Sequence, residues 1–171
     1  MILICYDGSK DAQAAIDRVG ELMPGSDAAV LVIWETILET LTRTGSLGMG
    51  FAMVGDFDDD GTDAAIEKAA HDTAAVGVQL ATAAGLVAEA RIANRQDDIA
   101  DDILAVARAL DAQVVVLGTR GLGSVKSLML GSVSHAVLHH ADRPVLVIPS
   151  PALVEERQRW VEHALPAAGI S

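Results

Sequence analysis

Aromatic and basic residues are scarce in this chain of 171 residues. Aromatic side chains make up 3% of the sequence, and 12 Lys and Arg residues stand against 24 Asp and Glu residues, for a net charge of −12. An acidic chain without a run of Lys or Arg repels nucleic acid phosphates and anionic lipid, so a nucleic-acid partner and a membrane-surface role are both disfavoured. The core must be aliphatic, because 51% of the residues are hydrophobic and so few of them are aromatic.

Cysteine and long apolar runs are also nearly absent. The single cysteine, Cys5, cannot form a disulfide within the chain, and its place in an apolar run predicts a small buried side chain rather than a reactive thiol. No run reaches the roughly 18 apolar residues of a membrane span, and the start Met1–Asp7 lacks the basic segment of a signal peptide. We therefore expect a cytoplasmic protein without membrane insertion.

Short apolar runs alternate with stretches of helical spacing through most of the chain. The runs that predict strands are residues 2–6, 28–34, 87–93, 114–117 and 145–148. The stretches with helical spacing are residues 12–22, 63–84, 99–110 and 132–140. This alternation predicts one α/β domain over residues 1–149, a doubly wound open sheet of parallel strands with helices on both faces.

Two segments fall outside this pattern. Residues 42–61 hold five glycines and an acidic run, which predicts a loop or lid rather than an ordinary connection. The C-terminal extension, residues 150–171, places apolar residues on one face of a short predicted helix. That helix could dock on its own sheet or on another subunit.

Glycines gather where two predicted strands end, and ligands bind at this edge of open parallel sheets. The first strand ends in Asp7-Gly8-Ser9, the fourth leads into the glycine-rich stretch 118–123, and Gly131-Ser132-Val133-Ser134 opens a helix. Glycines let the backbone approach a ligand, and free N–H groups at a helix start hold an anion. Together these features predict a phosphate cradle, with the Ser132 and Ser134 hydroxyls as donors or as a helix cap.

Two well-known phosphate motifs do not fit this cradle. Gly118 and Gly123 have the spacing of a Walker loop, but Ser124-Val125 follow where Lys and Ser or Thr are needed. The first strand is not followed by G-x-G-x-x-G, the dinucleotide fingerprint. P-loop NTPase chemistry is therefore excluded, and hydride transfer is disfavoured.

Three motifs in this chain, taken together, have the spacing and residue types of a known protein family. They are the spacing Gly118-x2-Gly121-x9-Gly131-Ser132, the stretch Arg143-Pro144-Val145-Leu146-Val147-Ile148, and the opening Tyr6-Asp7-Gly8-Ser9. They resemble the universal stress protein family, and specifically its ATP-binding branch, over about residues 1–149. The resemblance implies a sheet of five parallel strands, bound ATP with Mg²⁺, and a homodimer that pairs through the strand Val145–Ile148.

The resemblance also implies which residues surround the nucleotide. Asp7 would lie near the adenosine with Trp34 beside it, and Leu117-Gly118 at the adenine and ribose. The residues implied around the phosphates are Gly121, Gly131, Ser132, Val133 and Ser134. Two plainer roles stay open, because Asp7 could bond its own turn and Trp34 could be ordinary core.

The chain departs from the family pattern before its third predicted helix. Family members often carry Gly-Asp-Pro there, whereas this chain has Asp97-Asp98-Ile99, so the far wall of the pocket could follow another path. Positive charge near the phosphates could come from Arg120 or Lys126, and the alternative is that both side chains are simply solvated.

A calcium-loop pattern lies in the acidic segment. Asp56-x-Asp58-x-Asp60-Gly61-x5-Glu67 satisfies the EF-hand loop, but the glycines before it disfavour an entering helix, and Asp63 stands where an apolar residue is usual. We interpret the acidic residues as a helix start capped by Thr62 or Asp60.

These observations favour a regulatory module that binds ATP and hydrolyses it slowly at most. We assign no catalytic and no metal-ligating residue, since the sequence offers no evident general base or metal-binding carboxylate pair for fast phosphoryl transfer. The alternatives are a nucleotide-hydrolysing enzyme with residues 42–61 as its lid and a nucleotide-free dimerisation module.

Overall fold

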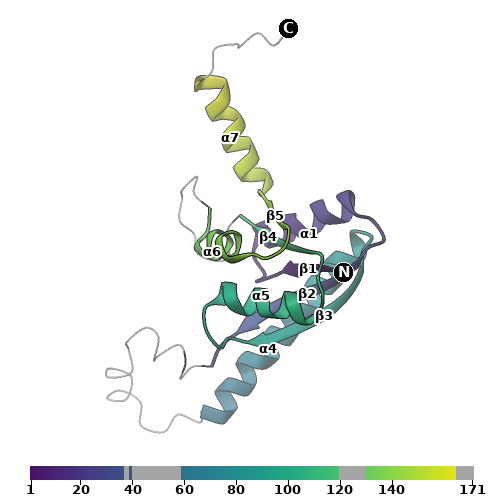
Figure 1. Ribbon diagram of the computed structural model, residues 1–171, viewed down its shortest axis with the longest axis vertical. Helices are drawn as coiled ribbons and strands as arrows, with labels where there is room; N and C mark the ends of the chain where they lie inside the picture. The colour runs from purple at the N-terminus through teal and green to yellow at the C-terminus, as the bar shows by residue number, and fades with distance from the viewer. Residues whose placement is uncertain (37–38, 40–58, 120–129, 165–171) are drawn as a thin grey trace, which may run out of the picture.

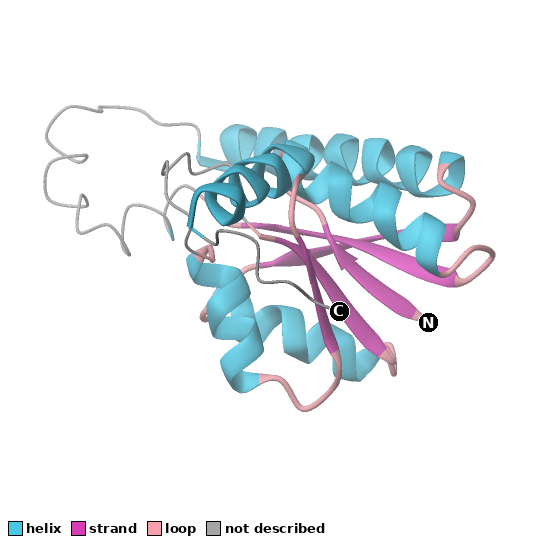
Figure 2. Cartoon of the chain, turned by 90° about the horizontal axis from the view of Figure 1, so that it is seen from above, coloured by secondary structure: helices cyan, strands magenta, loops and turns pink. Residues whose placement is uncertain are grey.

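The protein is a three-layer α/β structure in which helices cover both faces of one sheet (Figures 1 and 2). The computed structural model describes residues 1–36, 39, 59–119 and 130–164. Its strands are β1 (Ile2–Cys5), β2 (Asp27–Trp34), β3 (Val87–Asn94), β4 (Val114–Gly118) and β5 (Val145–Ile148). Its helices are α1 (Lys10–Leu22), α4 (Asp59–Ala83), α5 (Ile99–Ala109), α6 (Ser132–His140) and α7 (Pro151–Ala164).

All five strands are parallel and lie in the order β3-β2-β1-β4-β5. The central strands are apolar throughout because helices bury them from both sides, which is why their runs do not alternate. The predicted fold class is confirmed.

Two aliphatic clusters fill the space between the sheet and its helices. On one face, α1 and α4 pack small residues such as Ala15 and Ala74 against Ile4 and Val30. On the other face, α5 and α6 pack against the remaining strand residues, with Leu104 among the most buried. Figure 2 shows these two helical layers above and below the strands.

The start of α4 differs from its prediction. The helix begins at Asp59, earlier than the predicted residue 63, so Asp60 and Thr62 lie inside it. The prediction that one of them caps this helix is therefore wrong. Helix propensity explains the error: acidic residues are favoured throughout the first turn and not only at the cap, so composition alone does not fix the boundary.

The extension after β5 forms the predicted helix and leaves the body of the domain. Leu153, 1% exposed, packs at the beginning of α7. Farther along, Val161 is 45% exposed, and the helix projects away from the sheet (Figure 1).

Candidate functional site

The carboxyl ends of the parallel strands meet at one edge of the sheet, and the winding direction reverses between β1 and β4. The chain runs outward from β1 through β2 to β3, then crosses back to β4 on the other side of β1. In open α/β sheets this switch point leaves a crevice in which ligands bind.

The end of β4 is held tightly against α1. A Cβ atom on Gly118 would lie 2.8 Å from the Asp11 carbonyl carbon and 3.0 Å from the Ala12 nitrogen, so only glycine permits this approach. The buried Thr119 then donates its hydroxyl to Asp11 Oδ2 at 3.0 Å. Gly118 and Thr119, the first residues of the glycine-rich stretch, are therefore held against the first turn of α1.

The same strand end also fixes the start of α6. The N–H of Gly131 donates to the Thr119 carbonyl at 2.8 Å, and the Ser134 hydroxyl donates to the Gly118 carbonyl at 2.8 Å. Ser134 is 5% exposed, so its hydroxyl joins helix to strand, while Ser132 lies on the surface.

The N-terminus of α6 differs from those of α1 and α5. Ser9 Oγ accepts the N–H of Ala12 in α1, and Asp98 Oδ1 accepts the N–H of Ala100 in α5. The cap of α6 is Gly131, without a side-chain hydrogen bond and without an acidic residue in the first turn. Its first N–H groups, on Ser132, Val133 and Ser134, therefore point out of the helix with no acceptor in the described part of the chain.

Asp7 and Trp34 occupy the ends of β1 and β2. Asp7 is exposed, and its Oδ1 accepts the Ser9 N–H at 3.0 Å, so the turn role is confirmed. Trp34 packs against the α1 and α4 cluster but is only partly buried, so part of this residue stays exposed at the end of β2. Leu117 is buried in the opposite cluster. The structure thus brings Asp7, Gly118 and the start of α6 to neighbouring positions of one edge.

Several predicted positions lie outside the described residues. They are Gly121, Arg120, Lys126, and the Asp56 and Asp58 positions of the calcium-loop pattern.

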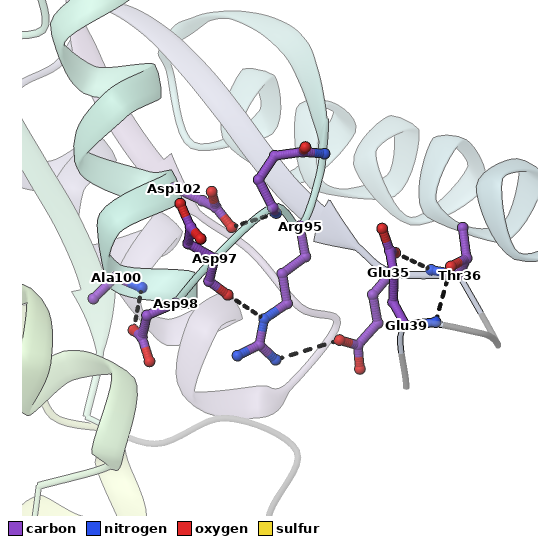
Figure 3. Close-up of polar contacts among 9 residues, drawn as sticks. Glu35, Thr36, Glu39, Arg95, Asp97, Asp98, Ala100 and Asp102 are labelled. Carbon is purple, nitrogen blue, oxygen red and sulfur yellow. Dashed lines mark hydrogen bonds and ion pairs between the residues drawn. The ribbon is translucent and has the colours of Figure 1, made fainter. Parts of the chain in front are cut away.

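A polar network at the ends of β2 and β3 was not predicted. The Arg95 guanidinium donates to the Asp97 carbonyl at 2.9 Å and lies 3.4 Å from Glu35 Oε2 (Figure 3). These contacts join the end of β2 to the loop that carries Asp97-Asp98-Ile99. No local sequence motif predicts the contact between Glu35 and Arg95, because these residues are sixty positions apart in the sequence.

Another part of this network did have a sequence signal. The Thr36 N–H donates to Glu39 Oε2 at 2.8 Å, and the Glu39 N–H donates to Thr36 Oγ1 at 3.2 Å. This reciprocal pair is a capping box, whose pattern is Ser or Thr followed three residues later by Glu or Gln. Thr36 and Glu39 fit this pattern, so this pair of contacts was predictable from the sequence.

We expect the Cys5 thiol to be unreactive in the folded protein. Burial, and secondarily the nearby Asp7 carboxylate, raise the pKa of Cys5 to about 12. Because the thiolate is the nucleophile, a disulfide reagent at pH 8 should modify Cys5 only after denaturant is added. Rapid stoichiometric labelling of the native protein would contradict this prediction.

The fold and the edge just described define an open α/β domain whose strand ends include the switch point at which such folds bind ligands. The chain belongs to the universal stress protein family, whose family model matches residues 1–149. Among the described residues, no helix has both the length and the apolar character needed to cross a membrane.

Curated relatives and solved structures agree with this assignment. Universal stress protein YxiE of Bacillus subtilis is 29% identical over 150 residues, which cover 86% of this chain and 97% of that protein. A universal stress protein of Mycolicibacterium smegmatis is 27% identical over 147 residues, 86% of this chain, and the match spans 47% of that longer relative.

Two similar structures contain nucleotides. An Arabidopsis thaliana universal stress protein family protein with AMP bound has a TM-score of 0.59 at 19% identity, covering 88% of this chain and 92% of its own. A universal stress protein from Archaeoglobus fulgidus in complex with dAMP has a TM-score of 0.55 at 20% identity, covering 86% and 95%.

Proposed function

We propose that this chain is an ATP-binding regulatory module that holds ATP with Mg²⁺ at the strand ends around β1 and β4. The uncapped N-terminus of α6 carries the proposal. Its N–H groups lack an acceptor within the described part of the chain, and the helix dipole favours an anion there. A bound phosphate would supply the missing acceptors.

Residues at the ends of β1 and β2 could contact the ribose and the base of the same nucleotide. The exposed Asp7 carboxylate can accept hydrogen bonds from ribose hydroxyls, and Gly118 lets β4 pack closely on α1, which fixes the strand end that leads toward α6. Trp34 at the end of β2 offers an apolar surface to the base. Mg²⁺ would be held mainly by phosphate oxygens and water, as it commonly is beside nucleotides, and would neutralise phosphate charge. The AMP and dAMP complexes of similar folds support an adenine nucleotide as the ligand.

We propose binding rather than rapid turnover. Fast phosphoryl transfer needs a positioned base and metal-holding carboxylates, and the contacts on which this site rests are backbone N–H groups and one turn carboxylate. We further propose a cytoplasmic homodimer that pairs through β5. This strand lies at an edge of the sheet, and three of its four side chains, those of Val145, Leu146 and Val147, are only partly buried.

Ser132→Asp is expected to weaken ATP binding by about tenfold or more, because a carboxylate in the first turn of α6 repels the phosphates that the same N–H groups would bind. It should not lower the melting temperature, since an acidic residue at a helix N-terminus is itself stabilising. Isothermal titration calorimetry with Mg·ATP measures the first effect and thermal unfolding the second.

Two variants serve as controls for this experiment. Ser132→Ala removes the hydroxyl without adding charge and should weaken ATP binding much less than Ser132→Asp does. Gln113→Asp adds the same charge at an exposed position before β4 and should also bind normally. Equal ATP affinity in Ser132→Asp and the unmodified protein would exclude the α6 phosphate site. No ATP binding at all would favour the nucleotide-free dimerisation module, and many turnovers per minute would favour the enzyme.

A further inference from the structure

Asn94, the last residue of β3, holds an unsatisfied buried atom at the ligand edge. Its side-chain oxygen is enclosed and has no hydrogen-bond partner, and it is the one such side-chain nitrogen or oxygen among the residues that the structure describes. A buried carbonyl oxygen without a donor costs about 1–3 kcal/mol. Such an atom calls for a donor from outside the described residues, such as a ligand or an ordered water.

The position of Asn94 relative to Trp34 follows from the register of the strands. The two residues are paired partners on β3 and β2. In-register residues on neighbouring strands point to the same face, and both Trp34 and Ile92, two residues before Asn94, pack against the α1 and α4 cluster. The Asn94 amide therefore lies on the same face as the Trp34 ring.

The neighbouring backbone holds Asn94 in place. The Arg95 N–H donates to the Trp34 carbonyl at 2.6 Å, and the Arg95 side chain is tied to Glu35 and to the Asp97 carbonyl (Figure 3). These contacts fix the backbone immediately after Asn94 and so set where its side chain leaves the strand.

The sheet sets the distance between this atom and the proposed phosphate site. Neighbouring strands lie about 4.8 Å apart, so β4 and β3, separated by β1 and β2, are about 14 Å apart. A nucleotide whose phosphates meet α6 beyond β4 and whose ribose meets Asp7 at β1 would place its base over β2. The outer edge of that base would then reach β3.

We propose that Asn94 selects the base, its side-chain oxygen accepting a hydrogen bond from the exocyclic amine of a 6-aminopurine. This inference rests on the proposed function and adds a residue that discriminates between bases. In the amide orientation of this structure, a 6-oxopurine would set a carbonyl oxygen against the Asn94 oxygen, leaving two acceptors unpaired, and would bind less tightly.

The test compares ATP with ITP, which carries an oxo group in place of the amine, by calorimetric titration. The unmodified protein should prefer ATP by about tenfold. Asn94→Leu, similar in size but without hydrogen-bonding atoms, should bring the ratio of the two affinities close to one, mainly by weakening ATP. Asn94→Asp keeps the acceptor and should keep the preference. Gln96→Leu removes a neighbouring exposed amide and should leave the ratio unchanged.

The outcomes separate this inference from the proposed function. Equal affinities for ATP and ITP in the unmodified protein would overturn the role of Asn94 while leaving ATP binding intact, and this comparison does not depend on any variant folding. A preference that persists in Asn94→Leu would overturn it as well, and a lower melting temperature of the unliganded variant would then indicate that the oxygen binds structural water. Failure to bind either nucleotide would overturn both proposals.

Discussion

Gly118→Ala is expected to lower the free energy of unfolding by about 2–3 kcal/mol, the upper part of the range of about 1–3 kcal/mol that is typical of overpacking. The added Cβ would lie 2.8 Å from the Asp11 carbonyl carbon, 2.9 Å from its oxygen and 3.0 Å from the Ala12 nitrogen. All three are backbone atoms in the first turn of α1, so no side-chain rotation can relieve the overlap. Strand β4 must shift away from α1, which also strains the Thr119 to Asp11 hydrogen bond.

Urea unfolding and thermal unfolding both measure this effect, the latter as a decrease of about 5–10 °C in melting temperature. Because the Thr119 carbonyl also positions Gly131, we expect ATP affinity to fall in the variant that remains folded. Gln113→Ala, at an exposed position just before β4, is the control and should change stability by less than about 0.5 kcal/mol. A stability equal to that of the unmodified protein would mean that β4 and α1 can separate without cost.

Gly20→Ala is expected to cost about 2 kcal/mol even though alanine is the better helix former by about 1 kcal/mol. Gly20 lies in α1 where the helix crosses the end of α4. A Cβ atom there would overlap the carbonyl oxygen of Ala84 and would lie 2.5 Å from the Ala84 side chain. The close crossing of the two helices therefore depends on the missing side chain, and the steric term outweighs the propensity term.

The functional consequence should differ between the two glycine variants. Gly20 lies toward the end of α1, whereas the proposed nucleotide site lies at its beginning, so Gly20→Ala should retain its ATP affinity once the unfolded fraction is subtracted. Asp17→Ala, an exposed change in the same helix, is the stability control. Chemical denaturation together with calorimetry gives both quantities. If Gly20→Ala is as stable as Asp17→Ala, or if it loses ATP binding while folded, this account of the helix crossing is wrong.

The regular elements could be predicted from the sequence because each is encoded locally. The boundaries of α6 and β5 match their predictions at both ends, and the other strands differ by one residue or less at each end. A short aliphatic run bounded by polar or turn residues is the direct mark of a strand buried on both faces. Helix α4 was harder, because the acidic stretch at its start offers more than one candidate cap, and the predicted caps Asp60 and Thr62 lie inside the helix.

Only part of the candidate site could be predicted from the sequence in this way. Asp7, Gly118 and Gly131 carry local signals, since turn residues and glycines follow strands. The sequence alone could not predict a role for Arg95 or Asn94. Their places depend on the pairing of β2 with β3 and on contacts with residues about sixty positions away. Ser134 carried a local signal for a donor, but the tertiary structure directs its hydroxyl to Gly118.

The direction of the strands has a practical consequence for handling the protein. Because β1 starts at the amino edge of the sheet, an affinity tag or fluorophore attached at Met1 begins on the side opposite the proposed nucleotide site. Helix α7 instead departs from the carboxyl end of β5, on the side of the proposed site, and projects outward (Figure 1). A reporter dye on the exposed Arg157 would therefore sit on the ligand side of the domain, whereas purification handles belong at the other terminus.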